Sequence, residues 1–240
     1  MEQVLAAVAL RKRFGALVVL DGVDFAVAGG DAVGIVGPNG AGKTTLLNVL
    51  AGSLRPGAGR IQLAGADVTK LGAAARCRLG IGRAHQVPRP FVGMTVFENV
   101  FVGASSGGGA HGARAYERCI DALELSGLAD RANRRAETLG LLDRKRLELA
   151  RALATGPRVL LLDEIGGGLT DGEAAELVRT IKELRARGIA IVWIEHIVHV
   201  LVQVVERLVC MDAGRVIADG DPHEVMRDAR VVDAYLGTAA

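Results

Sequence analysis

The chain has 240 residues, of which half are hydrophobic and only 3% aromatic, so it is long enough to bury one substantial core packed mainly by aliphatic side chains. Its 29 lysines and arginines nearly balance 27 aspartates and glutamates, and the net charge of +2 argues against a general nucleic-acid binder. Three widely spaced cysteines with no CxxC pair predict buried, reduced thiols rather than a disulfide framework.

Neither a signal peptide nor a membrane span is expected. Residues 1–10 have no basic region before their apolar residues. The longest apolar stretch, GIAIVWIEHIVHVLVQVV at residues 188–205, is interrupted by Glu195, His196, His199 and Gln203. Such a stretch is typical of a buried strand followed by a helix, and we expect a soluble, cytosolic protein.

The N-terminal part alternates strands and helices. Strands are expected at residues 4–10, 23–29 and 32–37, then a glycine-rich turn, a helix at 43–52, a strand at 60–65 and a short helix at 71–80. Alternation resumes near residue 158, with strands at 158–164, 189–196, 207–214 and 215–220 and a helix at 172–188. This order predicts an α/β fold with a mostly parallel sheet covered by helices on both faces.

The middle of the chain has helical periodicity instead, with helices expected at residues 94–104, 113–125 and 144–154. Inside it, SSGGGAHGA at residues 105–113 is of low complexity and predicts a flexible surface loop. We therefore predict one domain, with a core formed by residues 1–90 and 155–240 and a helical lobe inserted at residues 91–154.

A phosphate-binding loop is predicted at residues 37–45, GPNGAGKTT, which match G-x-x-x-x-G-K-[ST] between an apolar strand and a helix start. The glycines allow tight turns that aim backbone N–H groups at a polyphosphate, and the helix start adds its positive end. Lys43 supplies a positive charge for the β and γ phosphates, and the hydroxyl of Thr44 can bind Mg²⁺. The predicted nucleotide-binding residues are Gly37, Pro38, Asn39, Gly40, Ala41, Gly42, Lys43, Thr44 and Thr45.

The apolar run RVLLLDE at residues 158–164 supplies a second half of a nucleotide site. Asp163 follows the buried strand at its carboxyl end, where ligands of α/β sheets bind, and is predicted to hold Mg²⁺. Glu164 is predicted to polarise the attacking water. Two acids after an apolar strand are often only a strand reaching solvent, and the loop at residues 37–45 favours the functional interpretation.

The order of these motifs resembles the ATP-binding subunits of ABC transporters along essentially the whole chain. After GPNGAGKTT come GRAHQ, MTVFENV, RKRLELARALA directly before the acidic strand end, and IVWIEH. GIGRAHQ, MTVFENV, WIEH and the tail VVDAYLG are similar to the cassettes of branched-chain amino acid importers. The resemblance implies a P-loop NTPase fold with an antiparallel β subdomain beside the parallel core and the helical lobe.

The resemblance also implies roles for further residues. Phe14 corresponds to the aromatic that stacks on adenine, with Val19 near the ribose. Gln86 would reach the metal and the attacking water, and His196 would contact the γ-phosphate and position the water near Glu164. The cofactors implied are ATP and Mg²⁺.

One segment departs from the family pattern. Where most members read L-S-G-G-Q, at a helix N-terminus that contacts the γ-phosphate of a second subunit, this chain reads LGLLD at residues 139–143. Gly140, Leu141 and Leu142 keep backbone N–H groups for that contact but lose the serine hydroxyl. The loss should weaken a closed dimer by about 1.5–3 kcal/mol per site. Ile165 and Thr170 likewise replace a usual proline and aspartate.

The implied function is ATP hydrolysis that powers an importer, for branched-chain or other amino acids. The implied partners are transmembrane permease subunits, a second cassette in a homo- or heterodimer and, indirectly, a periplasmic solute-binding protein, with this chain peripheral on the inner face of the membrane. Alternatives are a lipid or lipopolysaccharide exporter and a weakly active regulatory partner. A mechanical or DNA-associated ABC protein is excluded, because the chain lacks a long heptad insertion.

Overall fold

The computed structural model describes residues 3–236. The first part contains β1 (Gln3–Phe14), β2 (Leu17–Ala28), β3 (Ala32–Val36), α1 (Lys43–Ala51), β4 (Ala58–Leu63), β5 (Ala66–Asp67), α2 (Ala73–Arg78) and β6 (Ile81–Ala84). Helices follow: α3 (Val96–Val102), η1 (Gly103–Gly107), α4 (Ala113–Leu125), η2 (Ala129–Arg131), η3 (Ala136–Thr138) and α5 (Leu141–Ala154). The last part contains β7 (Val159–Asp163), α6 (Asp171–Ala186), β8 (Ala190–Ile194), α7 (Val198–Leu201), β9 (Arg207–Asp212), β10 (Arg215–Gly220), α8 (Pro222–Val225) and α9 (Ala229–Leu236).

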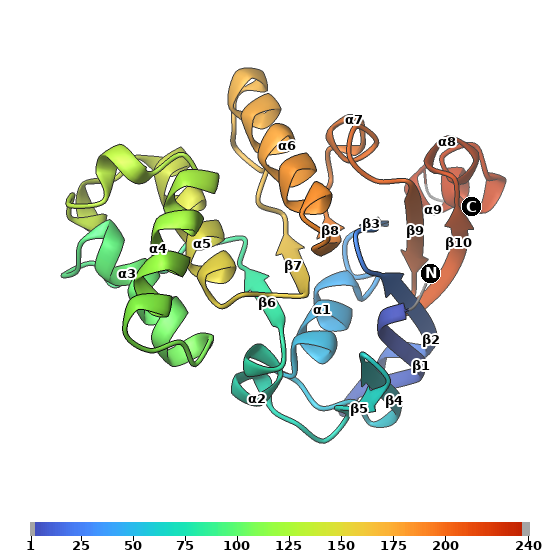
Figure 1. The fold of residues 1–240 in the computed structure, drawn as a ribbon. Coiled ribbons are helices and arrows are strands. Elements are labelled where there is room, and N and C mark those ends of the chain that lie inside the picture. Colours follow the sequence, from blue (N-terminus) through green and yellow to red (C-terminus); the bar gives the residue numbers. More distant parts are fainter. Residues whose placement is uncertain (1–2, 237–240) are drawn as a thin grey trace.

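The strands form two sheets (Figure 1). One is antiparallel, with strand order β2-β1-β4-β5. The other has the order β10-β9-β3-β8-β7-β6, and its neighbouring strands are parallel except for β10 and β9. Both the mostly parallel core sheet and the antiparallel sheet confirm the predicted α/β fold.

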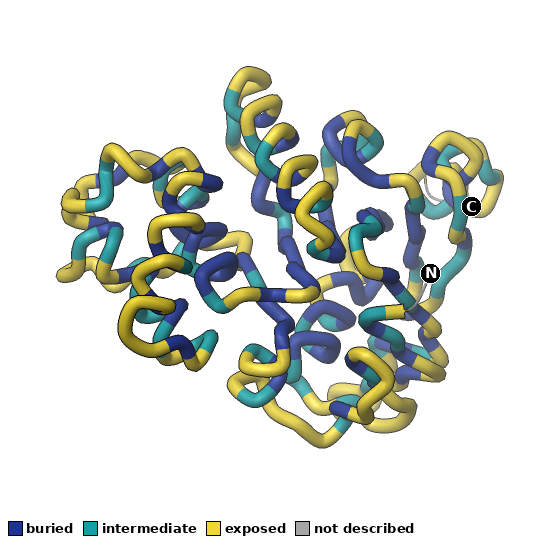
Figure 2. Tube along the Cα trace, in the orientation of Figure 1, coloured by how far each residue is buried: buried dark blue, intermediate teal, exposed yellow. Residues whose placement is uncertain are grey.

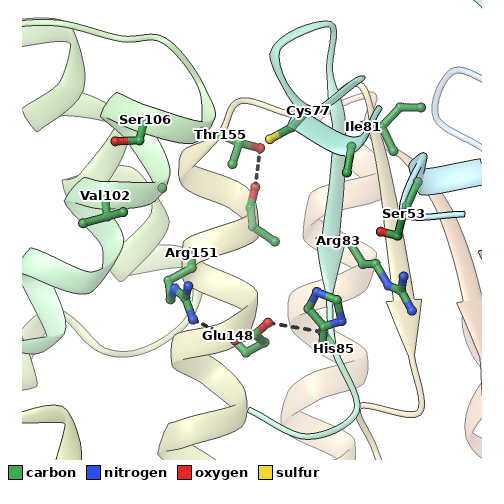
Figure 3. A pocket seen from close by; sticks show the side chains of 15 residues that line it. Ser53, Cys77, Ile81, Arg83, His85, Val102, Ser106, Glu148, Arg151 and Thr155 are labelled. Atoms are coloured by element: carbon green, nitrogen blue, oxygen red, sulfur yellow. Dashed lines mark hydrogen bonds and ion pairs between the residues drawn. The ribbon is translucent and has the colours of Figure 1, made fainter. Parts of the chain in front are cut away.

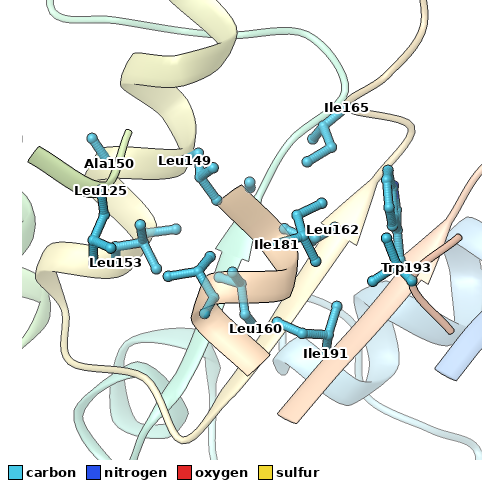
Figure 4. Close-up of a cluster of buried hydrophobic side chains, with 14 of the residues drawn as sticks. Leu125, Leu149, Ala150, Leu153, Leu160, Leu162, Ile165, Ile181, Ile191 and Trp193 are labelled. Atoms are coloured by element: carbon cyan, nitrogen blue, oxygen red, sulfur yellow. The ribbon is translucent and has the colours of Figure 1, made fainter. Parts of the chain in front are cut away.

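The core is divided by the six-stranded sheet, because successive side chains of a strand point to opposite faces. Val159 and Leu161 of β7 pack in a cluster with α1 and the antiparallel sheet, whereas Leu160 and Leu162 pack with α5 and α6. Every residue of β3, β7 and β8 is buried, as expected for strands covered on both faces. Figure 2 shows this buried centre, and Figure 4 shows the side chains on the α5 and α6 face.

Helix α1 is held at its end as well as at its start. Gly52 ends it in a left-handed conformation, and the buried Arg76 of α2 donates to the carbonyls of Val49 and Leu50 at 2.7 and 2.8 Å. The guanidinium therefore satisfies carbonyls at the negative end of the helix whose other end follows the phosphate-binding loop.

Residues 91–154 contain helices and one isolated β-bridge between Thr95 and Arg135. Thr95 begins α3 through a capping box with Glu98. The expectation of a flexible loop at residues 105–113 is wrong for its first part, because η1 continues α3 as a π-helix. A Cβ on Gly103 would lie 2.5 Å from the Arg151 carbonyl oxygen, so glycine permits η1 to lie against α5.

The cysteine prediction is partly confirmed. All three cysteines are free thiols, and Cys119 and Cys210 are buried, but Cys77 is only half-buried. Burial raises the pKa of both Cys119 and Cys210 to about 11. Within residues 3–236, no helix combines the length and the apolar character needed to cross a bilayer.

Candidate functional site

The predicted phosphate-binding loop joins β3 to α1, and two of its glycines are required by their surroundings. Gly37 has φ 143°, and a Cβ there would lie 2.0 Å from the Met211 carbonyl oxygen. Gly42 has φ 101°, and its Cβ would lie 2.6 Å from the carbonyl oxygen of Val19. The loop therefore passes against the backbones of β9 and β2 at distances that side chains do not permit.

Lys43, the first residue of α1, is 6% exposed and folds back over the loop. Its ammonium donates to the carbonyls of Gly37 and Pro38 at 2.7 and 2.9 Å. Burial lowers the pKa of Lys43, and the nearby carboxylates of Glu164 and Asp163 oppose that shift. The lysine thus binds the loop backbone and lies near the two acids predicted with it.

The other residues of the loop differ in their exposure to solvent. Thr44, the predicted metal ligand, is exposed in the first turn of α1, and Thr45 beside it is half-buried. Asn39 and Gly40 are exposed at the tip of the loop, while Ala41 is buried. Solvent therefore reaches Asn39, Gly40 and Thr44 in this loop.

Phe14, predicted to stack on adenine, ends β1 and is 48% exposed. The Lys12 ammonium lies 5.2 Å from its ring centroid, a cation–π distance. Val19 is half-buried and touches the base of the loop beside Gly42. An aromatic face is therefore available on the antiparallel sheet for a base.

Asp163 ends β7 and is 5% exposed. Its Oδ2 accepts from Nη2 of Arg83 at 2.8 Å, and Nη1 of the same arginine donates to Oδ1 of Asn48 at 2.6 Å. Sequence reasoning missed Arg83. The available signal was a charged residue in a strand whose neighbours are apolar, since such a residue needs a buried partner.

Glu164 meets two other predicted residues. Its side chain accepts from Gln86 and lies 2.8 Å from Nε2 of His196. Glu164 has φ 49°, a left-handed conformation that costs a non-glycine residue energy, and its N–H donates to the Ile194 carbonyl at 2.9 Å. Backbone strain of this kind is concentrated at functional sites.

The donor set suits a magnesium ion shared with phosphates. Thr44, Asp163 and Gln86 offer hydroxyl, carboxylate and amide oxygens, which are the hard ligands that Mg²⁺ prefers. Among residues 3–236, no group of three or more His, Cys, Asp or Glu side chains could hold a metal by itself. Mg²⁺ usually binds through one or two carboxylates and substrate phosphates, so these residues fit it.

The structure does not bring Gly140, Leu141 and Leu142 to the phosphate-binding loop of the same chain. Gly140 is the N-cap of α5 and makes no side-chain capping bond, and Leu141 is 54% exposed. The three residues line a hollow of about 340 Å³ with residues 168–169, Arg131, Asp143, Arg146 and Glu173. Asp143, in the place of the family's glutamine, pairs with Arg131 and Arg146.

Other contacts near the site were not predicted from the sequence. The hydroxyl of Tyr235 in α9 accepts from the Gly37 N–H at 2.8 Å, across most of the chain length. Lys145 and Glu195 are both buried beside the segment after Glu164. Thr170, which replaces the usual aspartate, caps α6 through a capping box with Glu173.

A second cavity, of about 400 Å³, lies between β6 and helices α5 and η1 (Figure 3). Arg83 and His85 line it from β6 and the residue after it, and Glu148 and Arg151 line it from α5. Glu148 is 6% exposed and accepts from Arg151 at 3.1 Å. The same strand thus faces both this cavity and Asp163.

Comparison with known proteins identifies the family. Residues 20–166 match the family described as ABC transporter. The chain belongs to the ABC transporter family. Residues 215–240 also match a family described as branched-chain amino acid ATP-binding cassette transporter.

Two relatives match this ABC cassette over at least 99% of its length. It is 36% identical over 255 residues to the high-affinity branched-chain amino acid transport ATP-binding protein LivG of Salmonella typhimurium, with 100% of both chains covered. It is also 36% identical to the lipopolysaccharide export system ATP-binding protein LptB of Acidithiobacillus ferridurans, over 99% of this chain and 98% of the relative.

A solved ATP-binding cassette of an ABC transporter in its ADP conformation has the same fold, with a TM-score of 0.89 and 32% identity, over 99% of this chain and 100% of the other. This chain is accordingly the ATP-binding subunit of an ABC transporter, an ATPase coupled to transport.

Proposed function

We propose that this cassette powers the uptake of branched-chain or other amino acids. The observation that carries the proposal is the match of residues 215–240 to the branched-chain family, in addition to the cassette match at residues 20–166. Full-length similarity to LivG supports it. Export of lipopolysaccharide is the second candidate, and the similar identity to LptB favours it.

In this proposal the nucleotide is bound by three parts of the chain. Phe14 stacks on the base, with Val19 beside the ribose. Backbone N–H groups of residues 37–45 surround the phosphates, and the Lys43 ammonium binds the β and γ phosphates. Support comes from the position of Lys43, which already lies over the loop and near both acids.

The hydrolytic step uses the residues gathered at Glu164. Glu164 accepts a hydrogen bond from the attacking water, and His196 holds that carboxylate in place and contacts the γ-phosphate. Gln86 links the same carboxylate to the segment that leads into the helical residues 91–154. Mg²⁺, held by Thr44, Asp163 and Gln86 together with the phosphates, would neutralise charge that develops on the phosphate oxygens.

A second cassette would complete the site from across an interface. Residues 140–142 lie at the uncapped start of α5, in a hollow separate from the phosphate-binding loop of their own chain. We propose that they face the nucleotide of the partner cassette and offer it no serine hydroxyl. We further propose that the partner has a segment closer to the family pattern L-S-G-G-Q, so that the two nucleotide sites of the pair are unequal. Rapid, cooperative hydrolysis by this chain alone, as a homodimer, would contradict unequal sites.

The permease is proposed to bind near the segment after Gln86. Val96 and Val100 of α3 are 0% exposed, so this face of the helix packs inward. Exposed apolar side chains occur just before α3 instead, at Val87, Phe91, Val92 and Met94. By binding the permease, these residues would hold the cassette at the inner face of the membrane. A periplasmic solute-binding protein would lie on the other side of the membrane and act on the cassette only through the permease.

Uptake in cells tests the proposed substrate class. Deleting the gene should abolish transport of labelled leucine, isoleucine and valine, and a plasmid copy should restore it. A Lys43→Ala copy should not restore transport, although the protein accumulates. Unchanged uptake together with a loss of lipopolysaccharide from the cell surface would contradict the importer and favour the exporter.

A further inference from the structure

The segment that follows Glu164 is held by side chains at three successive residues. The N–H of Gly166 donates to Oε1 of Glu195 at 2.5 Å. The ammonium of Lys145 donates to the carbonyl of Ile165 at 2.9 Å and also to the carbonyl of Gly167. Both side chains lie in stretches that carry the family resemblance, RKRLELARALA and IVWIEH, but neither was assigned a role there, and neither belongs to the phosphate-binding loop.

The two side chains reach this segment from different elements. Lys145 comes from the second turn of α5, and Glu195 is the residue directly after β8. They are 9% and 2% exposed, and among residues 3–236 neither takes part in an ion pair. The peptide groups of residues 165–167 therefore bind both buried charges. The carbonyl oxygens accept from the Lys145 ammonium, and an amide N–H donates to the Glu195 carboxylate.

The carboxylate of Glu195 is itself fixed. The indole of Trp193, which is fully buried, donates from Nε1 to the same Oε1 at 3.3 Å. Trp193 and Ile165 both belong to the buried cluster of Figure 4. Apolar packing therefore holds the indole that binds Glu195 and also the residue that precedes Gly166. A Cβ on Gly166 would lie 2.8 Å from Oε1, so glycine at this position allows the backbone to approach the carboxylate.

The segment and one of the side chains that hold it adjoin, along the chain, the two groups proposed for hydrolysis. Ile165 directly follows Glu164, whose backbone is in the left-handed region, and Glu195 directly precedes His196. A left-handed non-glycine residue persists only where surrounding contacts determine its backbone. Contacts on residues 165–167 supply that constraint on one side, and the Glu164 N–H bond to Ile194 supplies it on the other.

We propose that Lys145 and Glu195 are positioning residues that clamp residues 165–167 from two sides and so hold Glu164 against His196. The clamp also connects α5, whose first turn carries Gly140 to Leu142, with the hydrolytic pair. This inference rests on the hydrolytic role proposed for Glu164. It assigns to one buried lysine and one buried glutamate a function beyond packing.

Paired variants test the clamp. Lys145→Met and Glu195→Ala should each lower kcat about 10- to 100-fold, because small displacements of a reacting group have effects of this size. KM and the calorimetric affinity for ATP should change less than about 2-fold, since the phosphate-binding loop is untouched. The conservative variants Lys145→Arg and Glu195→Gln keep a donor and an acceptor, and should retain most of kcat. Lys182→Met, an exposed lysine on α6, is the matched control.

Two further results decide between a clamp and general destabilisation. The kcat loss of the Lys145→Met, Glu195→Ala double variant should fall well short of the product of the single losses, because both act on one segment. Hydrogen exchange at the Gly166 amide should accelerate in Glu195→Ala, and this can be measured even if the wild-type protein proves not to hydrolyse ATP. Independent kcat effects, a parallel loss of ATP affinity, or unchanged exchange at Gly166 would overturn the proposal.

Discussion

Nε2 of His196 lies 2.8 Å from Oε1 of Glu164. The two residues follow the neighbouring parallel strands β8 and β7, whose register pairs Ile194 with Asp163. Their contact is therefore determined by the sheet, with Gln86 approaching the same carboxylate from the end of β6. Residues far apart in the sequence meet at the carboxyl ends of three adjacent strands, which is where ligands of parallel sheets bind.

The first prediction concerns hydrolysis. Glu164→Gln keeps the size of the side chain but removes the proton acceptor, so ATP turnover should fall about 10²- to 10⁴-fold. ATP affinity should stay within a few-fold of the wild type, because the phosphate-binding loop is unchanged. Phosphate release and calorimetry measure the two quantities separately. Loss of affinity by as much as turnover would show that Glu164 binds nucleotide rather than promoting hydrolysis.

The second prediction concerns the buried pair of Arg83 and Asp163, whose side chains are 10% and 6% exposed. Removing one partner leaves an uncompensated buried charge, so Arg83→Met should lower the free energy of unfolding by about 3–5 kcal/mol. Adding Asp163→Leu should recover part of that loss, since no lone charge is then left buried. Urea denaturation measures both. If the double variant were less stable than Arg83→Met, the ion pair would not be the reason for the loss.

The third prediction concerns the far end of the phosphate-loop helix. Arg76 is 0% exposed, and besides Val49 and Leu50 it donates to the carbonyls of Leu71 and Thr69 at 3.0 Å. Arg76→Met should lower the free energy of unfolding by at least about 3 kcal/mol, because hydrogen bonds to charged groups contribute about 1.5–3 kcal/mol each.

Arg78→Met is the control for Arg76, because Arg78 is exposed on the same helix. It should change the free energy of unfolding, measured by urea denaturation, by no more than about 0.5 kcal/mol, as most surface substitutions do. Equal effects of the two variants would mean that the carbonyls of α1 do not need the buried guanidinium.

The fourth prediction concerns pH. Burial raises the pKa of Glu195, although hydrogen bonds from Gly166 and Trp193 act in the opposite direction. A carboxyl whose pKa is higher in the folded protein contributes stability below its unfolded pKa and loses it as pH rises through the folded pKa. Glu195→Gln cannot ionise, so its stability relative to the wild type should increase as pH rises through that interval.

Urea midpoints of the wild type and Glu195→Gln, measured from about pH 4 to pH 7, test this. The difference between the two proteins should move in favour of the variant with increasing pH. A difference that is constant, or that moves toward the wild type, would show that the carboxylate is already fully stabilised by its partners.

The fold could be predicted, and the residues of the candidate nucleotide site could be located, because their signals are local. Apolar strands that end in defined motifs indicated β3, β7 and β8, and the parallel register then brought Glu164 and His196 together. The strand runs alternate with helices over most of the chain, and that alternation was sufficient to predict the sheet.

The remaining features depend on distant packing. Arg83, Lys145, Glu195 and Tyr235 bind backbone or side-chain atoms at other places in the chain, and no spacing in the sequence identifies those partners. The glycines near residue 105 suggested flexibility, yet Gly103 is needed for close packing of η1 against α5. Composition describes what a segment permits, whereas its neighbours decide which conformation it adopts.

The most direct test of the account is the affinity of Lys43→Ala for ATP. A buried ammonium over the phosphate-binding loop should contribute about 2 kcal/mol or more to nucleotide binding, so calorimetry should show at least a roughly 30-fold loss of affinity. Lys70→Ala, at an exposed lysine, should bind like the wild type. An undiminished affinity of Lys43→Ala for ATP would contradict the nucleotide site on which the proposed function depends.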